Sequence, residues 1–142
     1  MRTAVATYDP KMVTIAWGGM ILSGFAEGTF IKITRNGNAF DKKRGAGGDV
    51  ERVNKNAYDF QVELTLLQTS TSNTNLSVAL TADQVGNVGV LPLIIKDLLG
   101  TTLFTAPQAW IAKDPDAEFG DDTSGRAWLF ETGAAGSLLG GN

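Results

Sequence analysis

The chain has neither cysteine nor histidine among its 142 residues. Without cysteine there is no disulfide framework and no thiolate nucleophile, and nothing indicates an oxidising compartment. Without histidine the commonest acid/base group near neutral pH and the commonest zinc ligand are missing. Serine–histidine and cysteine–histidine catalysis are therefore excluded, and we expect no enzyme, no cofactor and no metal centre.

Long apolar runs and an excess of positive charge are also missing. No window approaches the run of about 18 apolar residues that a membrane helix needs, and the N-terminal MRTAVATYDPK lacks the apolar core of a secretory signal. We therefore expect no membrane anchor and production in cytoplasm-like conditions. The net charge is −3, whereas a sequence-independent DNA binder needs a positive field, so tight DNA binding is not expected.

The composition that is present favours a mainly β domain. There are 17 glycines but 4 prolines, with seven Phe and three Trp to fill a core. The length suits one domain, residues 1–142, which can bury roughly 68–70% of its unfolded surface. We expect a two-layer β-sandwich or partial barrel of about seven or eight strands with one flanking helix. The strands are expected at residues 12–17, 20–22, 29–35, 58–66, 91–97, 102–113 and 126–132.

Residues 57–80 form the stretch around which the chain is organised. The segment alternates strictly between an apolar face, formed by Tyr58, Phe60, Val62, Leu64 and Leu66, and a polar face, formed by Asp59, Gln61, Glu63 and Thr65. The apolar face is predicted to be buried, and we expect Tyr58, Phe60 and Val62 to hold the sandwich together. A polar run at 70–75 then provides helix-capping side chains, so a helix is expected over about 73–85.

Three further patterns concern the core. The segment LPLIIKD, residues 91–97, is apolar on both faces and is predicted to lie deep between the layers. Pro107 predicts a bulge or an edge, because proline cannot donate to a strand ladder. The three tryptophans lie on apolar strand faces, which favours core packing over a sugar-binding platform, and the glycine-rich C-terminal residues are expected to be mobile.

Residues 38–56 differ abruptly in composition from their surroundings. They hold five basic and three acidic side chains around Gly45, Gly47 and Gly48, which predicts a long projecting hairpin. It is either a solvated loop or an arm that orders on a partner. A phosphate-binding loop is excluded because no helix opens after the glycines and no GK[ST] occurs.

Residues 113–122 hold five carboxylates. The spacing of Asp114, Asp116 and Glu118 resembles the start of a calcium loop, but the glycine comes one position late and Gly125 replaces the required glutamate. Paired carboxylates on one loop do not indicate a glycosidase cleft. We therefore interpret the segment as an exposed acidic loop.

A sandwich of this kind exposes sheet edges, which a ring of identical subunits removes by joining the sheets. In such a ring the polar side chains Asp59, Gln61, Glu63 and Thr65 are candidates for lining a water-filled lumen. Acidic and neutral polar side chains repel phosphate, so DNA could pass without binding.

The order of these segments resembles the tail tube (inner tube) proteins of contractile-tailed bacteriophages. The resemblance lies in FQVELTLLQTSTSNTNLS (60–77), IIKDLLGTTLFTAPQAWIAKDPD (94–116) and GRAWLFE (125–131), together with the charged hairpin. It implies a virion tail protein, assembled in the host cytoplasm, whose hexameric rings stack into a DNA conduit. It also implies that sheath, baseplate and terminator proteins are partners and that a long loop reaches the next subunit or ring. Type VI secretion tubes share this architecture.

The charges suggest how copies could contact one another. We expect head-to-tail pairing between basic side chains of the hairpin and acidic side chains of the late loop. The candidates are Lys42, Lys43, Arg44 and Arg52 on the hairpin and Asp114, Asp116, Glu118, Asp121 and Asp122 on the loop. Two alternatives stay open: another tail or baseplate component, such as a tube-initiator ring, and a ligand-binding β-sandwich module.

Overall fold

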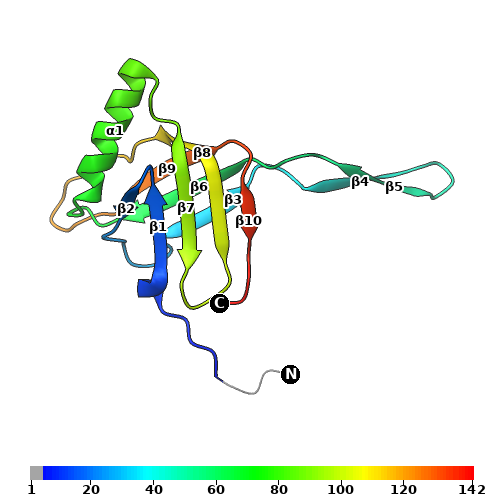
Figure 1. The fold of residues 1–142 in the computed structure, drawn as a ribbon, viewed down its shortest axis with the longest axis horizontal. Helices are drawn as coiled ribbons and strands as arrows, with labels where there is room; N and C mark the ends of the chain where they lie inside the picture. The colour runs from blue at the N-terminus through cyan, green and yellow to red at the C-terminus, as the bar shows by residue number, and fades with distance from the viewer. Residues whose placement is uncertain (1–4) are drawn as a thin grey trace.

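The computed structural model describes residues 5–142, which form ten β-strands, one α-helix and one turn of 3-10 helix, η1 (Figure 1). In chain order the elements are η1 (Pro10–Met12), β1 (Val13–Trp17), β2 (Met20–Leu22), β3 (Ile31–Arg35), β4 (Phe40–Arg44), β5 (Val50–Asn54), β6 (Phe60–Leu66), α1 (Ser72–Gly86), β7 (Leu91–Asp97), β8 (Leu103–Lys113), β9 (Arg126–Thr132) and β10 (Gly136–Leu138).

Eight of the strands form one antiparallel sheet, in the order β2-β1-β7-β8-β9-β6-β3, with β10 added along β8. The long strand β8 belongs to both halves of this sheet. Its first residues pair with β7 and β10, and its last residues pair with β9. β8 is therefore the strand at which the sheet passes from one layer to the other.

Two irregularities bend β8. Between the pairs Leu93↔Ala106 and Leu91↔Ala109 it carries an extra residue, and Pro107 lies in this bulge, as predicted. A second register shift with β9 follows between Ile111 and Lys113. Because bulges bend and twist a strand, they let the sheet fold over onto itself.

Aromatic side chains fill the space between the two halves. Trp17 of β1 packs edge-on against Phe130 of β9, with ring centroids 5.4 Å apart, and Phe60 packs in the same way against Phe104 at 5.2 Å. The Trp17 indole N–H donates to the carbonyl of Ala109 at 3.1 Å, so its one polar atom is satisfied inside the core. The predicted alternation of β6 is confirmed, since Phe60, Val62, Leu64 and Leu66 are all buried.

The helix is also confirmed, although its start is arranged differently from the expected cap. The residue before it, Thr71, makes no side-chain cap hydrogen bond. Instead Ser70 accepts from the amide of Ser72 and donates to the carbonyl of Ser23 at 2.7 Å, which ties the helix start to the end of β2. Asn87 ends the helix with a left-handed φ of 52°. Within residues 5–142 no helix is long and apolar enough to cross a membrane.

Four expectations about individual segments are wrong. β7 is buried on one face only, and Ile94 is 45% exposed. Trp110 lies half-buried on the outer face rather than in the core, because it stands opposite Glu131 of β9. Tyr58 precedes β6 and is half exposed, so it does not hold the layers together. The C-terminal residues are held, by β10 and by a hydrogen bond from the Thr101 amide to the Gly141 carbonyl.

The fold class is as predicted: mainly β, folded into two layers, with a flanking helix and a projecting hairpin, β4–β5. The main sheet does not close into a barrel among the described residues, so β2 and β3 are left as its edges. The architecture thus leaves the open edges of the main sheet and the projecting hairpin without partners within the described chain.

Candidate assembly surfaces

The predicted lumen residues lie on the outer face of the layer formed by β9, β6 and β3. Glu63 stands between Lys32 of β3 and Leu129 of β9, and Gln61 stands between Thr34 and Glu131. Asp59 comes directly before β6 and accepts from the Asn36 side chain at 3.1 Å, an amide that also reaches Glu131 at 3.3 Å. Asp59 and Glu63 are exposed, and Gln61 and Thr65 are half-buried. These four side chains form a continuous polar surface together with their neighbours on β3 and β9.

The start of the acidic loop lies against this same surface. Gln61 and Glu63 share a hollow of about 240 Å³ with the segment from Lys113 to Asp116. Within residues 5–142 no group of three or more acidic side chains is arranged to hold a metal ion. The surface is thus mixed: its carboxylates lie beside Lys32 and Lys113, and beside the apolar Leu129.

The hydrogen bonds between β3 and β6 show which residues of β3 have backbone groups on its free edge. The amide of Thr65 donates to the carbonyl of Phe30 at 2.8 Å, and the amide of Asn36 donates to the carbonyl of Asp59 at 3.1 Å. Because bonded and non-bonded positions alternate along an antiparallel pair, Lys32 and Thr34 also bond to β6. The backbone groups of Ile31 and Ile33 therefore point outward, where the described chain offers no strand to pair with them.

The hairpin β4–β5 leaves the sheet at the junction of β3 and β6 and projects far from the body (Figure 1). Every one of its ten strand residues is exposed except the half-buried Asp41. Gly37 permits the sharp exit from β3, since it adopts a φ of 99° that is unfavourable for other residues. The hairpin thus has no core of its own.

The register of the hairpin sorts its charges onto two different faces. Lys42 stands directly opposite Arg52, and Arg44 directly opposite Val50, so these four side chains share one face with Phe40. On the other face Lys43 stands opposite Glu51, and Asp41 binds Lys55 at 3.7 Å. We call the side of the hairpin formed by Phe40, Lys42, Arg44, Val50 and Arg52 the basic face. Its three cations have no carboxylate among the strand residues beside them.

The acidic loop joins β8 to β9 and lies at the other end of the molecule, on the side of α1 (Figure 1). Asp114, Asp116, Glu118, Asp121 and Asp122 are all exposed. Among the described residues the one ion pair is that between Lys55 and Asp41, so none of these five carboxylates is paired with a cation. The amide of Ser124 donates to Gln68 at 3.0 Å, just beyond the C-terminal end of β6, whereas the hairpin joins β6 at its N-terminal end. The predicted basic and acidic candidates therefore do not meet within one chain.

One exposed apolar surface was not predicted from the sequence. The outer face of the layer formed by β2, β1, β7, β8 and β10 carries exposed apolar side chains, among them Ile21, Ile94, Leu103 and Leu138. Ile21 pairs with Ala16, Ala16 with Ile94, and Ile94 with Thr105, so the face is uncharged along a row across the strands. The apolar face of LPLIIKD signalled burial, but the structure leaves that face uncovered.

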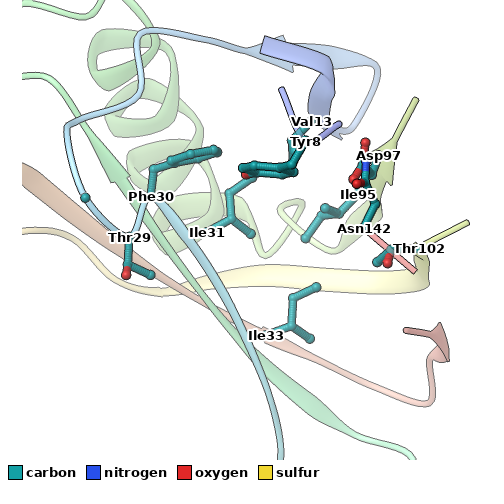
Figure 2. A pocket seen from close by; sticks show the side chains of 11 residues that line it. Tyr8, Val13, Thr29, Phe30, Ile31, Ile33, Ile95, Asp97, Thr102 and Asn142 are labelled. Atoms are coloured by element: carbon teal, nitrogen blue, oxygen red, sulfur yellow. The ribbon is translucent and has the colours of Figure 1, made fainter. Parts of the chain in front are cut away.

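A hollow of about 380 Å³ opens between the layers near β3 (Figure 2). Tyr8, Phe30 and Ile31 lie on one side of it, and Asp97, Thr102 and Asn142 gather on the other. Asp97 is 5% exposed and uses one carboxylate oxygen to accept from the amide of Leu99 at 3.0 Å, which stabilises the turn between β7 and β8. Sequence reasoning did not find this hollow, because its lining comes from five separate segments of the chain.

Comparison with known proteins places this fold among phage and injection-system proteins. Structural protein ORF10 of Pseudomonas phage KPP10 is 29% identical over 155 aligned positions, which cover 100% of this chain and 87% of that protein. No family model matches the chain.

Solved structures of injection-system and phage-like particles share this fold. A chain of the sheath/tube terminator of the extracellular contractile injection system PVC, in its extended state, has a TM-score of 0.65 at 10% identity and covers 96% of this chain and 100% of that one. A chain of the extended PVC sheath-tube complex has a TM-score of 0.64 at 10% identity, covering 93% and 91%. A chain from the virion of a native gene transfer agent has a TM-score of 0.62 at 11% identity, covering 94% and 100%.

At such low identity the structural likeness establishes the fold alone. The resemblance to tail tube proteins that was predicted from the sequence is therefore confirmed for the fold. The matches include a tube complex and a tube terminator with nearly equal scores, so they do not separate these two roles.

Proposed function

We propose that this chain is a structural subunit of a phage tail, and that copies of it assemble into hexameric rings that stack into a tail tube. The observation that carries the proposal is the hairpin β4–β5, whose strand residues are exposed apart from the half-buried Asp41 and pair with no strand of the main sheet in the described part of the chain. An isolated two-stranded hairpin is marginally stable in water at best, so a partner is needed to order it. The whole-chain likeness to tube and terminator proteins supports a second copy as that partner.

Ring formation would use the open sheet. The outward backbone groups of Ile31 and Ile33 form a short pairing edge, and a strand of the neighbouring copy adding to it removes that edge. Six sheets joined in this way form a continuous wall around a channel. The free edge of β3 is therefore the proposed contact within a ring.

The channel would be lined by the polar surface that contains Asp59, Gln61, Glu63 and Thr65. On this surface the carboxylates of Asp59, Glu63 and Glu131 outnumber the cation of Lys32, which would give the lumen a net negative field that repels phosphate. DNA would then pass through without specific binding. This arrangement makes the protein a passive conduit and no enzyme.

The remaining partners follow from this role. Sheath, baseplate and tail terminator proteins would contact the tube, and the assembled protein would belong to the virion tail, after assembly in the host cytoplasm. The outer face around Ile94, which is apolar apart from Lys96 on the same strand, is exposed in the single chain and is available for such contacts.

A second candidate is a terminator, cap or initiator ring of the same tail. The likeness to the PVC sheath/tube terminator favours it as much as the tube complex favours the first. The two candidate functions differ in how the assembly grows: a tube subunit polymerises without a fixed length, whereas a terminator stops at one ring.

Electron microscopy of purified protein over a range of concentrations tests both candidates. Tubes of varying length support the tube subunit, and single rings that cap preformed tubes support the terminator. Featureless monomers at every concentration, with and without purified baseplates as nuclei, would contradict both.

A further inference from the structure

We infer that the basic face of the hairpin, and not its opposite face, is the contact between successive copies, and that it receives the acidic loop, residues 114–122, of a second copy. This inference rests on the proposed function and names the surfaces that carry it. The basic face consists of Phe40, Lys42, Arg44, Val50 and Arg52, and it holds three cations and no carboxylate.

The two faces differ in how their charges are satisfied. On the opposite face each cation has an acid: Lys43 stands across from Glu51, and Lys55 binds Asp41 at 3.7 Å. On the basic face Lys42 stands across from Arg52, and like charges at directly opposed positions destabilise an antiparallel pair. An anionic partner on that face would relieve this repulsion.

The basic face also holds exposed apolar groups beside its charges. The Arg52 guanidinium lies 4.2 Å from the centre of the Phe40 ring, and Val50 is 61% exposed next to Arg44. The stacked pair holds Arg52 in place before binding, which lowers the entropy that a contact must offset. The face is thus partly ordered for docking in the free chain.

The acidic loop of a second copy fits this face by charge and by position. It offers five exposed carboxylates without cation partners in the described chain, and Phe119 stands among them, 83% exposed. The hairpin leaves the N-terminal end of β6, whereas the loop runs from beside Gln61 and Glu63 to Ser124, just beyond the C-terminal end of that strand. The two are different surfaces of one chain, so pairing them between copies repeats head to tail. A contact between two different surfaces of identical subunits propagates into rings or filaments, as a tube requires.

The hollow beside Asp97 is the competing acceptor. It offers one buried carboxylate, 5% exposed, and apolar walls to a basic side chain. The basic face carries three cations. The five carboxylates of the loop can neutralise all three, whereas the single carboxylate of Asp97 cannot, and this favours the loop as the acceptor.

Matched charge reversals test the inference. Lys42→Glu and Arg52→Glu alter the basic face, and the charge swap Lys43→Glu/Glu51→Lys alters the opposite face of the same hairpin while keeping its opposed pair of unlike charges. In moderate salt we expect each of the first two to raise the critical concentration for assembly about tenfold or more, because an attraction becomes a repulsion. Lys43→Glu/Glu51→Lys, which keeps an opposite-charge pair at the same position, should assemble as the unaltered protein does. Far-ultraviolet circular dichroism and the unfolding midpoint of each variant establish that the body is folded.

Complementary variants identify the acceptor. Mixing the Lys42→Glu/Arg52→Glu protein with an Asp114→Lys/Asp116→Lys/Glu118→Lys protein should restore mixed assemblies that neither forms alone. Asp97→Asn keeps the oxygen that accepts from Leu99 while removing the charge, so it should assemble normally.

Three outcomes would overturn the inference while leaving the proposed function standing: equal effects of Lys42→Glu and of the swap Lys43→Glu/Glu51→Lys, normal assembly of the Lys42→Glu/Arg52→Glu protein, or a block of assembly by Asp97→Asn. Failure of the unaltered protein to assemble with or without baseplates would instead contradict the proposed function itself.

Discussion

Trp17 of β1 packs edge-on against Phe130 of β9, at 5.4 Å between ring centroids, although the two strands belong to opposite layers of the fold. Both side chains are buried, at 1% and 0% exposure, and the Trp17 indole is anchored by its hydrogen bond to Ala109 of β8. The contact therefore joins the two layers and the bent strand that connects them.

Removing this contact should destabilise the fold strongly. We expect Phe130→Ala to lower the free energy of unfolding by about 3–5 kcal/mol, the range for deleting a buried aromatic side chain. Urea denaturation followed by tryptophan fluorescence measures this loss. Phe119→Ala is the control, because Phe119 is 83% exposed and its loss should change stability by less than about 0.5 kcal/mol. Equal effects of the two variants would mean that the layers do not meet through Phe130.

Asn73 connects the first turn of α1 to the sheet. Its side-chain oxygen accepts from the Trp128 indole at 2.9 Å, and its amide donates to the Leu67 carbonyl at 2.8 Å. Asn73→Ala leaves a buried indole N–H without a partner, so we expect a loss of about 1–3 kcal/mol in unfolding free energy. Asn75→Ala, at an exposed position of the same helix, should cost less than half as much. A stability of Asn73→Ala equal to that of Asn75→Ala contradicts the prediction.

Proline can probe the free edge of β3 one position at a time. At Thr34 a proline removes a bond to β6, so Thr34→Pro should destabilise the monomer by about 3 kcal/mol or more. At Ile33 the backbone N–H points outward, so Ile33→Pro should leave the monomer folded and block ring formation. Ile33→Ala, which loses the same side chain but keeps the N–H, should still form rings. The measurements are thermal unfolding of the monomer and electron microscopy of the assembled protein, and rings of normal yield from Ile33→Pro would refute the proposed edge contact.

The polar surface on β6 makes a prediction about DNA. If Glu63 faces the channel, Glu63→Lys should still permit assembly, but the tubes should retain duplex DNA in a salt-dependent manner, since phosphate now meets a ring of cations. Glu63→Gln removes the charge without reversing it and should retain far less DNA. Retention is measured by co-sedimentation of labelled DNA with tubes at rising salt concentrations. Tubes of Glu63→Lys that release DNA as readily as the unaltered protein would place Glu63 outside the channel.

Strand β6 and the hairpin could be predicted because their signals are local. Period-two alternation from Phe60 to Leu66 needs one dry face and one wet face whatever the topology, and the structure buries the predicted face. The dense charge between residues 38 and 56 likewise cannot enter a core, so a projecting element was predictable.

The segments that could not be predicted depend on what covers them. Ile94 has the side chain of a core residue, yet it is 45% exposed because nothing in the described chain packs over the outer face of β7. Trp110 is turned outward by its place opposite Glu131 beyond the bulge in β8. Burial on a given face is a property of the neighbouring layer, and no local pattern contains it.

The sequence by itself determined the mainly β class, the alternating strand β6, the helix after it and the charged hairpin, because each follows from the chemistry of adjacent residues. Only the tertiary structure decided that β8 bends to join both layers, that β3 is left as an edge, and that Lys42 stands opposite Arg52 while Lys43 stands opposite Glu51. The physical reason is that register and layer packing are set by long-range contacts, and a shift of one residue in pairing would exchange the two faces of a strand.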